Sequence, residues 1–286
     1  MASNNRKWSI AVLGVVPAII FVAALLVHPI AQDPGYHDFA DQRTIWGIAN
    51  FWNVVFLVTA ALGLRALRSN SAFTQIWERN AYRILLAGTV LVAFGSAYYH
   101  FAPNSQTLFW DRLPMTIVFM SLFATTIGER IDMRIGQRSL LPLLLIGIAS
   151  VIYWRISGDL RFYAMVQFYP MLMIPVLLAF REPRYSSGIG TWVMIVLYAC
   201  AKVLELFDRE LGDIFAAGGH PWKHVFSSAA LACYVIAVGR RRSLSTDRCL
   251  VTSIESSIVG VDCSRMVDGM GLEPTTPALR TRCSPN

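Results

Sequence analysis

The sequence predicts an all-α protein that crosses a membrane several times. The 286 residues are 55% hydrophobic, with a mean hydropathy of +0.48. Only 15% of them are charged, compared with about 25% in soluble domains. The apolar residues gather in runs of about 20, the length that an α-helix needs to span a bilayer. These runs follow one another too closely to leave room for a separate soluble domain.

Eight apolar runs are expected to form membrane-spanning helices. They cover residues 9–29, 48–66, 83–101, 112–128, 139–154, 162–180, 190–207 and 221–239. The first run follows Arg6 and Lys7, as in a signal peptide, but it is longer than a typical signal-peptide core and lacks an obvious small-residue cleavage site. We therefore expect it to remain in the protein as a helix.

The basic residues favour one orientation of these helices. With the N-terminus placed inside, the inner segments carry 14 basic residues and the outer segments carry four, or five if Arg112 at a boundary is included. Because cytoplasmic segments are enriched in Lys and Arg, we expect both termini to lie in the cytoplasm. The same clustering accounts for the net charge of +7, so we expect no nucleic-acid partner.

The C-terminal residues 243–286 differ from the rest of the chain. They are polar and lack helical periodicity, so we expect them to be disordered. Within them, 269–280 resembles peptides produced when a reading frame runs into a transfer-RNA gene, and we interpret the tail as a read-through extension. The five cysteines show no regular spacing, so we predict neither a disulfide framework nor a zinc finger.

All five histidines are predicted to lie at the outer end of the helices. They are His28, His37, His100, His220 and His224. His220 and His224 are four residues apart, so their imidazoles share one helix face. His100 ends a helix that reaches the same side. Three protein ligands with one open position for water are the pattern of catalytic zinc sites, whereas the pair alone is equally well explained as two interfacial histidines.

Two more polar residues are predicted close to these histidines. Ser96 lies one turn before His100 on the same face, although serines that only pack helices together are common. Asp111 stands at the start of the next span. An ionisable group at a membrane boundary usually marks function, but Asp is also a favoured N-cap. For the neighbouring Arg112 we expect a side chain that snorkels to the interface.

Further charged residues occur in and after the seventh span. Lys202 and Glu205 are three residues apart, and we expect them to pair on one helix face. The alternative is that they orient Lys223 or the metal site. We interpret Asp208 and Glu210 as solvated loop charges.

Three short motifs, in this order along the chain, resemble the alkaline ceramidase family. They are Gly95-Ser96-Ala97-Tyr98-Tyr99-His100, Trp110-Asp111-Arg112-Leu113-Pro114-Met115-Thr116 and His220-Pro221-Trp222-Lys223-His224, with Asn50-Phe51-Trp52-Asn53 as a further similarity. The family belongs to a superfamily of membrane hydrolases with adiponectin-receptor-like and haemolysin-III-like proteins. The resemblance covers about residues 36–240. It implies a seven-helix core within 31–242, with 1–30 as an extra N-terminal transmembrane helix.

The resemblance also implies a chemistry. His100, His220 and His224 would bind zinc, Asp111 would orient or deprotonate the metal-bound water, and Ser96 would bind the developing oxyanion or the metal site. The reaction would be hydrolysis of the amide bond of a ceramide-like lipid in the membrane, giving a sphingoid base and a fatty acid. A receptor-like member with a structural zinc site and a hydrolase of another N-acyl lipid remain alternatives. A transporter with a proton relay is disfavoured because the histidines share one side.

One segment departs from the family pattern. Animal members bind a regulatory calcium through acidic residues and an asparagine in the first segment. Here Asp38, Asp41 and Asn50 offer oxygen ligands, with Asn50 in place of a glutamate. Arg43 brings a positive charge into the same stretch. We therefore predict no tight calcium site.

Overall fold

A computed structural model gives the fold of the chain. It describes residues 26–39, 44–45, 48–49, 51–69, 72–186, 188–214 and 218–244, together with the helical positions 15, 19 and 22. Most of the expected N-terminal helix and of the segment 1–30 lies outside these residues, as does the tail 243–286 beyond its first two residues. Asp41, Arg43 and Asn50 also lie outside the described residues.

Seven α-helices follow one another in the described residues. They are α2 (Val54–Leu64), α3 (Ile76–Phe101), α4 (Ser105–Arg130), α5 (Met133–Ser157), α6 (Arg161–Phe180), α7 (Gly188–Leu206) and α8 (His220–Arg240). Shorter elements are the 3-10 turns η1 (Pro34–His37), η2 (Phe51–Asn53), η3 (Ala66–Arg68) and η4 (Glu210–Asp213), and a hairpin of β1 (Thr44–Ile45) and β2 (Ile48–Ala49). The prediction of a helical bundle is confirmed for this part of the chain.

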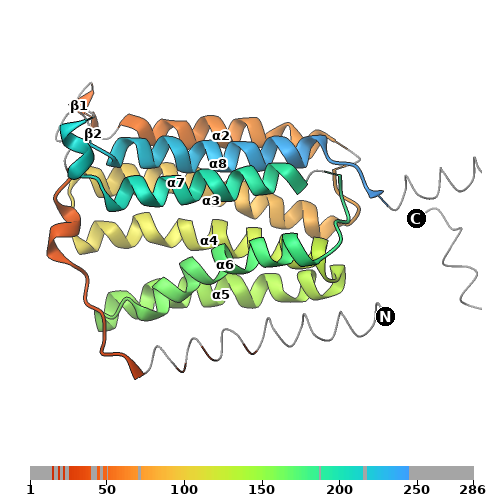
Figure 1. The fold of residues 1–286 in the computed structure, drawn as a ribbon, viewed down its shortest axis with the longest axis horizontal. Helices are drawn as coiled ribbons and strands as arrows, with labels where there is room; N and C mark the ends of the chain where they lie inside the picture. Colours follow the sequence, from red (N-terminus) through yellow and green to blue (C-terminus); the bar gives the residue numbers. More distant parts are fainter. Residues whose placement is uncertain are drawn as a thin grey trace, which may run out of the picture. The chain divides into compact units, whose positions relative to one another are not determined.

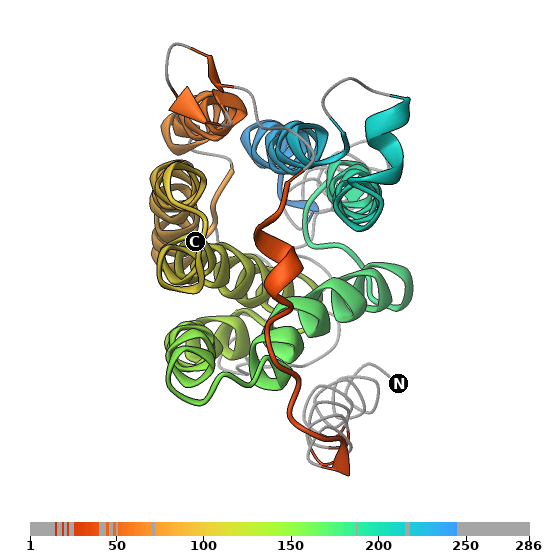
Figure 2. The ribbon, with the colours of Figure 1, turned by 90° about the vertical axis from the view of Figure 1, so that its left-hand side faces the viewer.

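The helices close into a ring (Figures 1 and 2). Each helix from α2 to α7 packs against the next one in the sequence, and α8 returns to pack against α2. The most extensive contacts join α3 to α4, α7 to α8 and α4 to α5. Because the ring closes, segments far apart in the sequence face one another across its interior.

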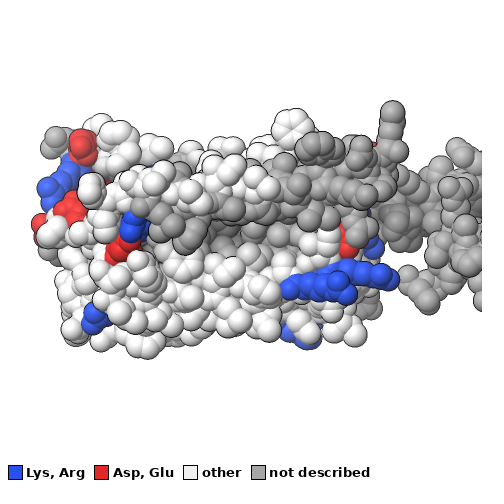
Figure 3. Space-filling model, turned by 90° about the horizontal axis from the view of Figure 1, so that it is seen from below, with Lys and Arg blue, Asp and Glu red and all other residues white. Residues whose placement is uncertain are grey.

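Five of the described helices, α3, α5, α6, α7 and α8, are long and apolar enough to cross a membrane. Their outward side chains include Leu172, Phe180 and Ile189, which are 64%, 81% and 80% exposed. On the face shown in Figure 3, charged side chains gather toward the two ends and leave an uncharged middle. These features support an integral membrane protein. The count of eight spans is not confirmed, since α2 has only 11 residues and α4 contains four charged residues.

Polar caps explain why two helices begin earlier than their apolar runs. Helix α3 begins at residue 76 rather than 83, behind a capping box in which Gln75 and Glu78 bond each other's backbone. Helix α4 begins at residue 105 rather than 112, because the Asn104 side chain accepts N–H bonds from its first turn. Asp111 therefore lies inside α4, and its interpretation as an N-cap was wrong.

The end of the bundle where α8 terminates is held by a buried ion network. The Arg241 guanidinium lies 3.3 Å from Oε1 of Glu78 and 3.6 Å from Oε2 of Glu129. Its Nε donates to the Ala72 carbonyl oxygen at 2.6 Å, and its guanidinium carbon stacks 3.9 Å from the centre of the Tyr185 ring. Loops and helix ends from four parts of the chain are thus joined by one side chain.

Candidate metal centre and its cavity

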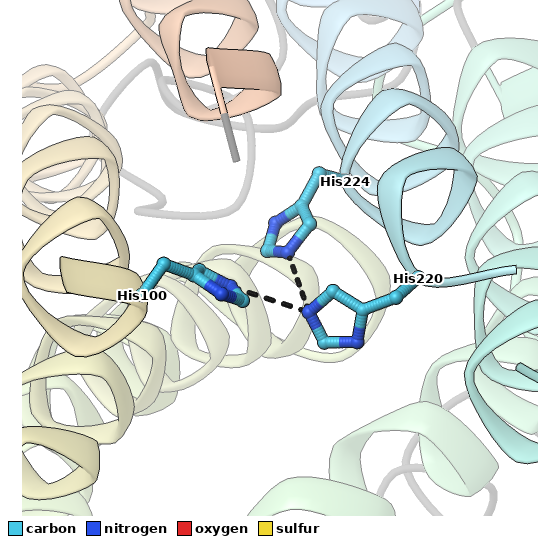
Figure 4. A group of neighbouring side chains, drawn as sticks. All are labelled: His100, His220 and His224. Atoms are coloured by element: carbon cyan, nitrogen blue, oxygen red, sulfur yellow. Dashed lines mark hydrogen bonds between the residues drawn. The ribbon is translucent and has the colours of Figure 1, made fainter. Parts of the chain in front are cut away.

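Three buried histidines converge at the end of the bundle opposite to Arg241 (Figure 4). Nε2 of His220 lies 3.2 Å from Nε2 of His100 and 3.2 Å from Nε2 of His224. One ligand atom from each residue lies within 4.8 Å of the others. Nitrogens bound to one tetrahedral zinc at about 2.0–2.1 Å would be about 3.3 Å apart. The three predicted ligands are therefore close enough to bind one metal ion.

The start of α8 is fixed against α7, and this contact positions His220. The backbone N–H of His220 donates to Oδ1 of Asp208 at 2.6 Å. A side chain at Gly219 would overlap the carbonyl oxygen of Leu204, so only glycine allows this close approach. Asp208 is therefore not the solvated loop charge that was expected but a partner of His220 at the start of α8.

A close contact between α3 and α4 places Ser96 beside Asp111. A side chain at Gly95 would overlap the carbonyl oxygen of Trp110, so the two backbones touch here. The Ser96 hydroxyl oxygen is buried and makes no hydrogen bond within the described residues. Both residues are buried and line the same cavity as His224.

The Phe39 side chain covers the histidines from outside the ring of helices. Its ring centre lies 4.6 Å from that of His100 and 4.3 Å from that of His220. The chain from Val27 to Phe39 crosses this end of the bundle, as Figure 2 shows. This phenyl ring shields His100 and His220 from water. Phe39 was missed in the sequence analysis because nothing in its local pattern indicates where a loop will cross.

The two other histidines do not join the centre. His28 is exposed. Nδ1 of His37 lies 2.9 Å from the Tyr99 hydroxyl, and burial, followed by the nearby positive charge of Arg112, lowers the pKa of His37. Asp38, the one described candidate among the oxygen ligands compared with the calcium site, lies exposed at 3.6 Å from Arg209. The absence of a tight calcium site remains a prediction.

A cavity of about 120 Å³ extends from His224 into the bundle. Its polar walls are formed by Tyr36, Ser96, Asp111, Arg112, Lys202, Glu205, Lys223 and His224. Its apolar walls include Phe56, Val92, Met115, Val118, Phe119, Leu122, Met171, Met194 and Leu231. A space lined in this way suits an amphipathic molecule with a polar group near the histidines.

Glu205 anchors a group of charges on the cavity wall. Its Oε2 accepts from Nζ of Lys202 at 2.6 Å, and its Oε1 accepts from Nζ of Lys223 at 2.8 Å. The Tyr36 hydroxyl donates to the same Oε1 at 3.0 Å. The predicted pair of Lys202 and Glu205 is confirmed, and the alternative that they orient Lys223 holds as well.

Arg112 does not snorkel to the interface, so that prediction was wrong. The residue is only 6% exposed. Its guanidinium carbon lies 4.3, 4.7 and 5.5 Å from the ring centres of Trp154, Tyr163 and Tyr36, and Nη2 donates to Oε1 of Gln32 at 2.7 Å. Nη1 is buried and has no hydrogen-bond partner among the described residues. The sequence shows that Arg112 follows Asp111 but not that three aromatic rings surround it.

Comparison of the chain with protein-family models, with curated proteins and with solved structures gives no match. The side chains that the fold brings together at this site therefore carry the information about function.

Proposed function

We propose that the protein is a metal-dependent hydrolase that cleaves the amide bond of N-acyl lipids, ceramide-like lipids among them, within the membrane. The observation that supports it best is the meeting of His100, His220 and His224 with Asp111 and Ser96 at the polar end of an apolar cavity. The donor set of three imidazoles suits zinc.

The chain's own residues supply the remaining parts of amide hydrolysis. A bound zinc would lower the pKa of water to about 7 and polarise a carbonyl. Asp111, buried on the cavity wall, is placed to accept a proton from the attacking water. The Ser96 hydroxyl, which has no hydrogen-bond partner in the described part of the chain, is placed to donate to the carbonyl oxygen as negative charge develops there. Water adds to the acyl carbon, the C–N bond breaks, and the amine takes a proton.

The apolar part of the cavity is placed to hold the acyl chain. Phe56, Val92, Met115 and Phe119 line it and offer no competing polar groups. A lipid amide bound with its chain among these residues would present its carbonyl to the polar end. Hydrophobic walls with few polar groups are typical of small-molecule sites.

The orientation follows from the basic residues. We place the histidine end of the bundle on the non-cytoplasmic side and both termini in the cytoplasm, because the sequence carries 14 basic residues on the other side. A reporter enzyme fused after Ser243 that is active only outside the cell would overturn this placement.

Release of labelled fatty acid from a long-chain ceramide by the detergent-purified protein tests the proposal. We expect release that a zinc chelator and His220→Ala both abolish, with at least a tenfold loss for each. His28→Ala is the matched control, since His28 is exposed and outside the centre. Zinc-containing protein that hydrolyses neither ceramide nor other N-acyl lipids would contradict the proposal and favour a receptor-like role with a structural metal.

A further inference from the structure

The polar end of the cavity has more positive than negative groups. Arg112, Lys202 and Lys223 line it, and Asp111 and Glu205 are the carboxylates on the same wall. Glu205 is already bonded to both lysines. A cation bound at the histidines would increase this excess. The local field therefore favours a ligand that carries a negative charge.

Arg112 is the group whose bonding is incomplete. An arginine has five N–H donors, and here Nη2 bonds Gln32 while Nη1 is buried without a partner. Among the described residues, no ion pair joins Arg112 to a carboxylate. A buried charged donor without a partner is costly. The three aromatic rings orient the guanidinium but give Nη1 no acceptor.

We propose that Arg112 binds a carboxylate of the substrate, so that the preferred substrates are N-acyl amino acids rather than neutral N-acyl lipids. This inference rests on the proposed function for the hydrolysis step but not for binding. Arg112 and Asp111 both line the cavity, so one ligand can present a carboxylate to the guanidinium and its amide to Asp111. N-acyl amino acids carry these two groups close together. The guanidinium favours a planar carboxylate because it can form charge-assisted hydrogen bonds to it.

A matched pair of substrates tests the preference. N-oleoylglycine and N-oleoylethanolamine share the acyl chain and the amide and differ in carrying a carboxylate or a hydroxymethyl group. We expect kcat/KM of the wild-type protein to be at least about tenfold higher for N-oleoylglycine, in line with the strength of charge-assisted hydrogen bonds. Equal values, or a preference for the ethanolamide, would overturn the inference without any variant.

Variants then assign the preference to Arg112. We expect Arg112→Gln to reduce the ratio of the two kcat/KM values to near one, and Arg112→Lys to retain part of it because a lysine keeps the charge but not the fork of donors. Arg155→Gln removes a positive charge from an exposed position of α5 and should keep the wild-type ratio. A wild-type ratio in folded Arg112→Gln would contradict the assignment.

Binding to an inactive protein separates this inference from the proposed function. In His220→Ala, with or without Arg112→Gln, ligand binding is measured by the thermal stabilisation that each lipid gives. We expect N-oleoylglycine to bind about tenfold more tightly than the ethanolamide when Arg112 is present, and equally when it is absent. Selective binding without wild-type hydrolysis would refute the hydrolase and keep the inference. Hydrolysis without selective binding would refute the inference and keep the hydrolase.

Discussion

The Tyr36 hydroxyl donates a 3.0 Å hydrogen bond to Oε1 of Glu205, joining positions 169 residues apart. Tyr36 belongs to η1, in the segment that crosses the end of the bundle, and Glu205 lies near the end of α7. Because Glu205 also binds Lys202 and Lys223, the crossing segment is attached to the same carboxylate that organises the cavity wall.

Loss of this hydrogen bond should destabilise the bundle end. We expect Tyr36→Phe to lower the free energy of unfolding by about 1–3 kcal/mol, because the acceptor is a charged carboxylate. Thermal unfolding in detergent measures the change. Tyr98→Phe is the control, since Tyr98 is 52% exposed. A destabilisation no larger than that of the control would mean that the bond contributes nothing.

Removal of the Phe39 phenyl ring that covers the histidines should weaken metal retention. We expect Phe39→Ala to increase the rate at which a chelator removes the metal by about tenfold, because the apolar shell around a site limits water access. Metal content after timed chelation gives the rate. Phe101→Ala, at a residue that is 79% exposed, controls for the loss of a phenyl ring. Equal rates for the two variants would show that Phe39 is not a cover.

A methyl group between α3 and α4 should separate the residues of the site. We expect Gly95→Ala to destabilise the protein by about 1–3 kcal/mol through overpacking and to reduce hydrolysis by about a hundredfold, since displacements of 1 Å have effects of that size. At Gly239, an added methyl would meet Ala66 at an ordinary distance of 3.4 Å, so Gly239→Ala should preserve both properties. Wild-type turnover in Gly95→Ala would contradict the close-contact argument.

Breaking the buried ion network at the other end should have a large effect on stability. We expect Arg241→Met to cost about 3–5 kcal/mol, because it leaves Glu78 buried without its charged partner. Arg240→Met is the neighbouring control, since Arg240 is exposed. Unfolding midpoints of the two variants should differ clearly. Adding Glu78→Gln to Arg241→Met removes the buried charge and keeps an acceptor for the helix cap, so it should recover part of the loss. Failure of that recovery would argue against an uncompensated charge as the cause.

Acidification should destabilise the segment that crosses the bundle end through His37. Its pKa is lowered in the folded protein by burial and by Arg112, so the unfolded chain takes up a proton more readily. The contribution of His37 to the free energy of unfolding is complete above the unfolded pKa of about 6.5. It decreases as the pH falls from there through the lowered pKa of the folded protein. His37→Gln should reduce the loss of stability between pH 7 and pH 5. An unchanged pH dependence would contradict this assignment.

The sequence allowed the meeting of the three histidines to be predicted, because helix periodicity and span direction fix depth. His100 and His220 lie on different helices, yet both were expected at one end, and their Nε2 atoms are 3.2 Å apart. Helix starts were less predictable, since caps such as Asn104 extend α4 beyond its apolar run. Hydropathy measures the apolar part of a helix, not its length.

Side-chain environments were harder to predict than positions. Arg112 was expected at the interface, but Trp154 and Tyr163 pack around it, and these come from the next two helices, α5 and α6. Asp208 likewise has its partner on the next helix, at the backbone of His220. Such pairings depend on how the ring closes, which no local pattern determines.

The two sides of the histidine centre belong to helices whose metal-site residues are 120 positions apart. An ion held by His100 and His220 would act as a removable cross-link, and its binding free energy would stabilise the folded chain. Metal supply and structural integrity would then be coupled. In a metal-poor cell, the protein would lose mechanical closure at this end of the bundle.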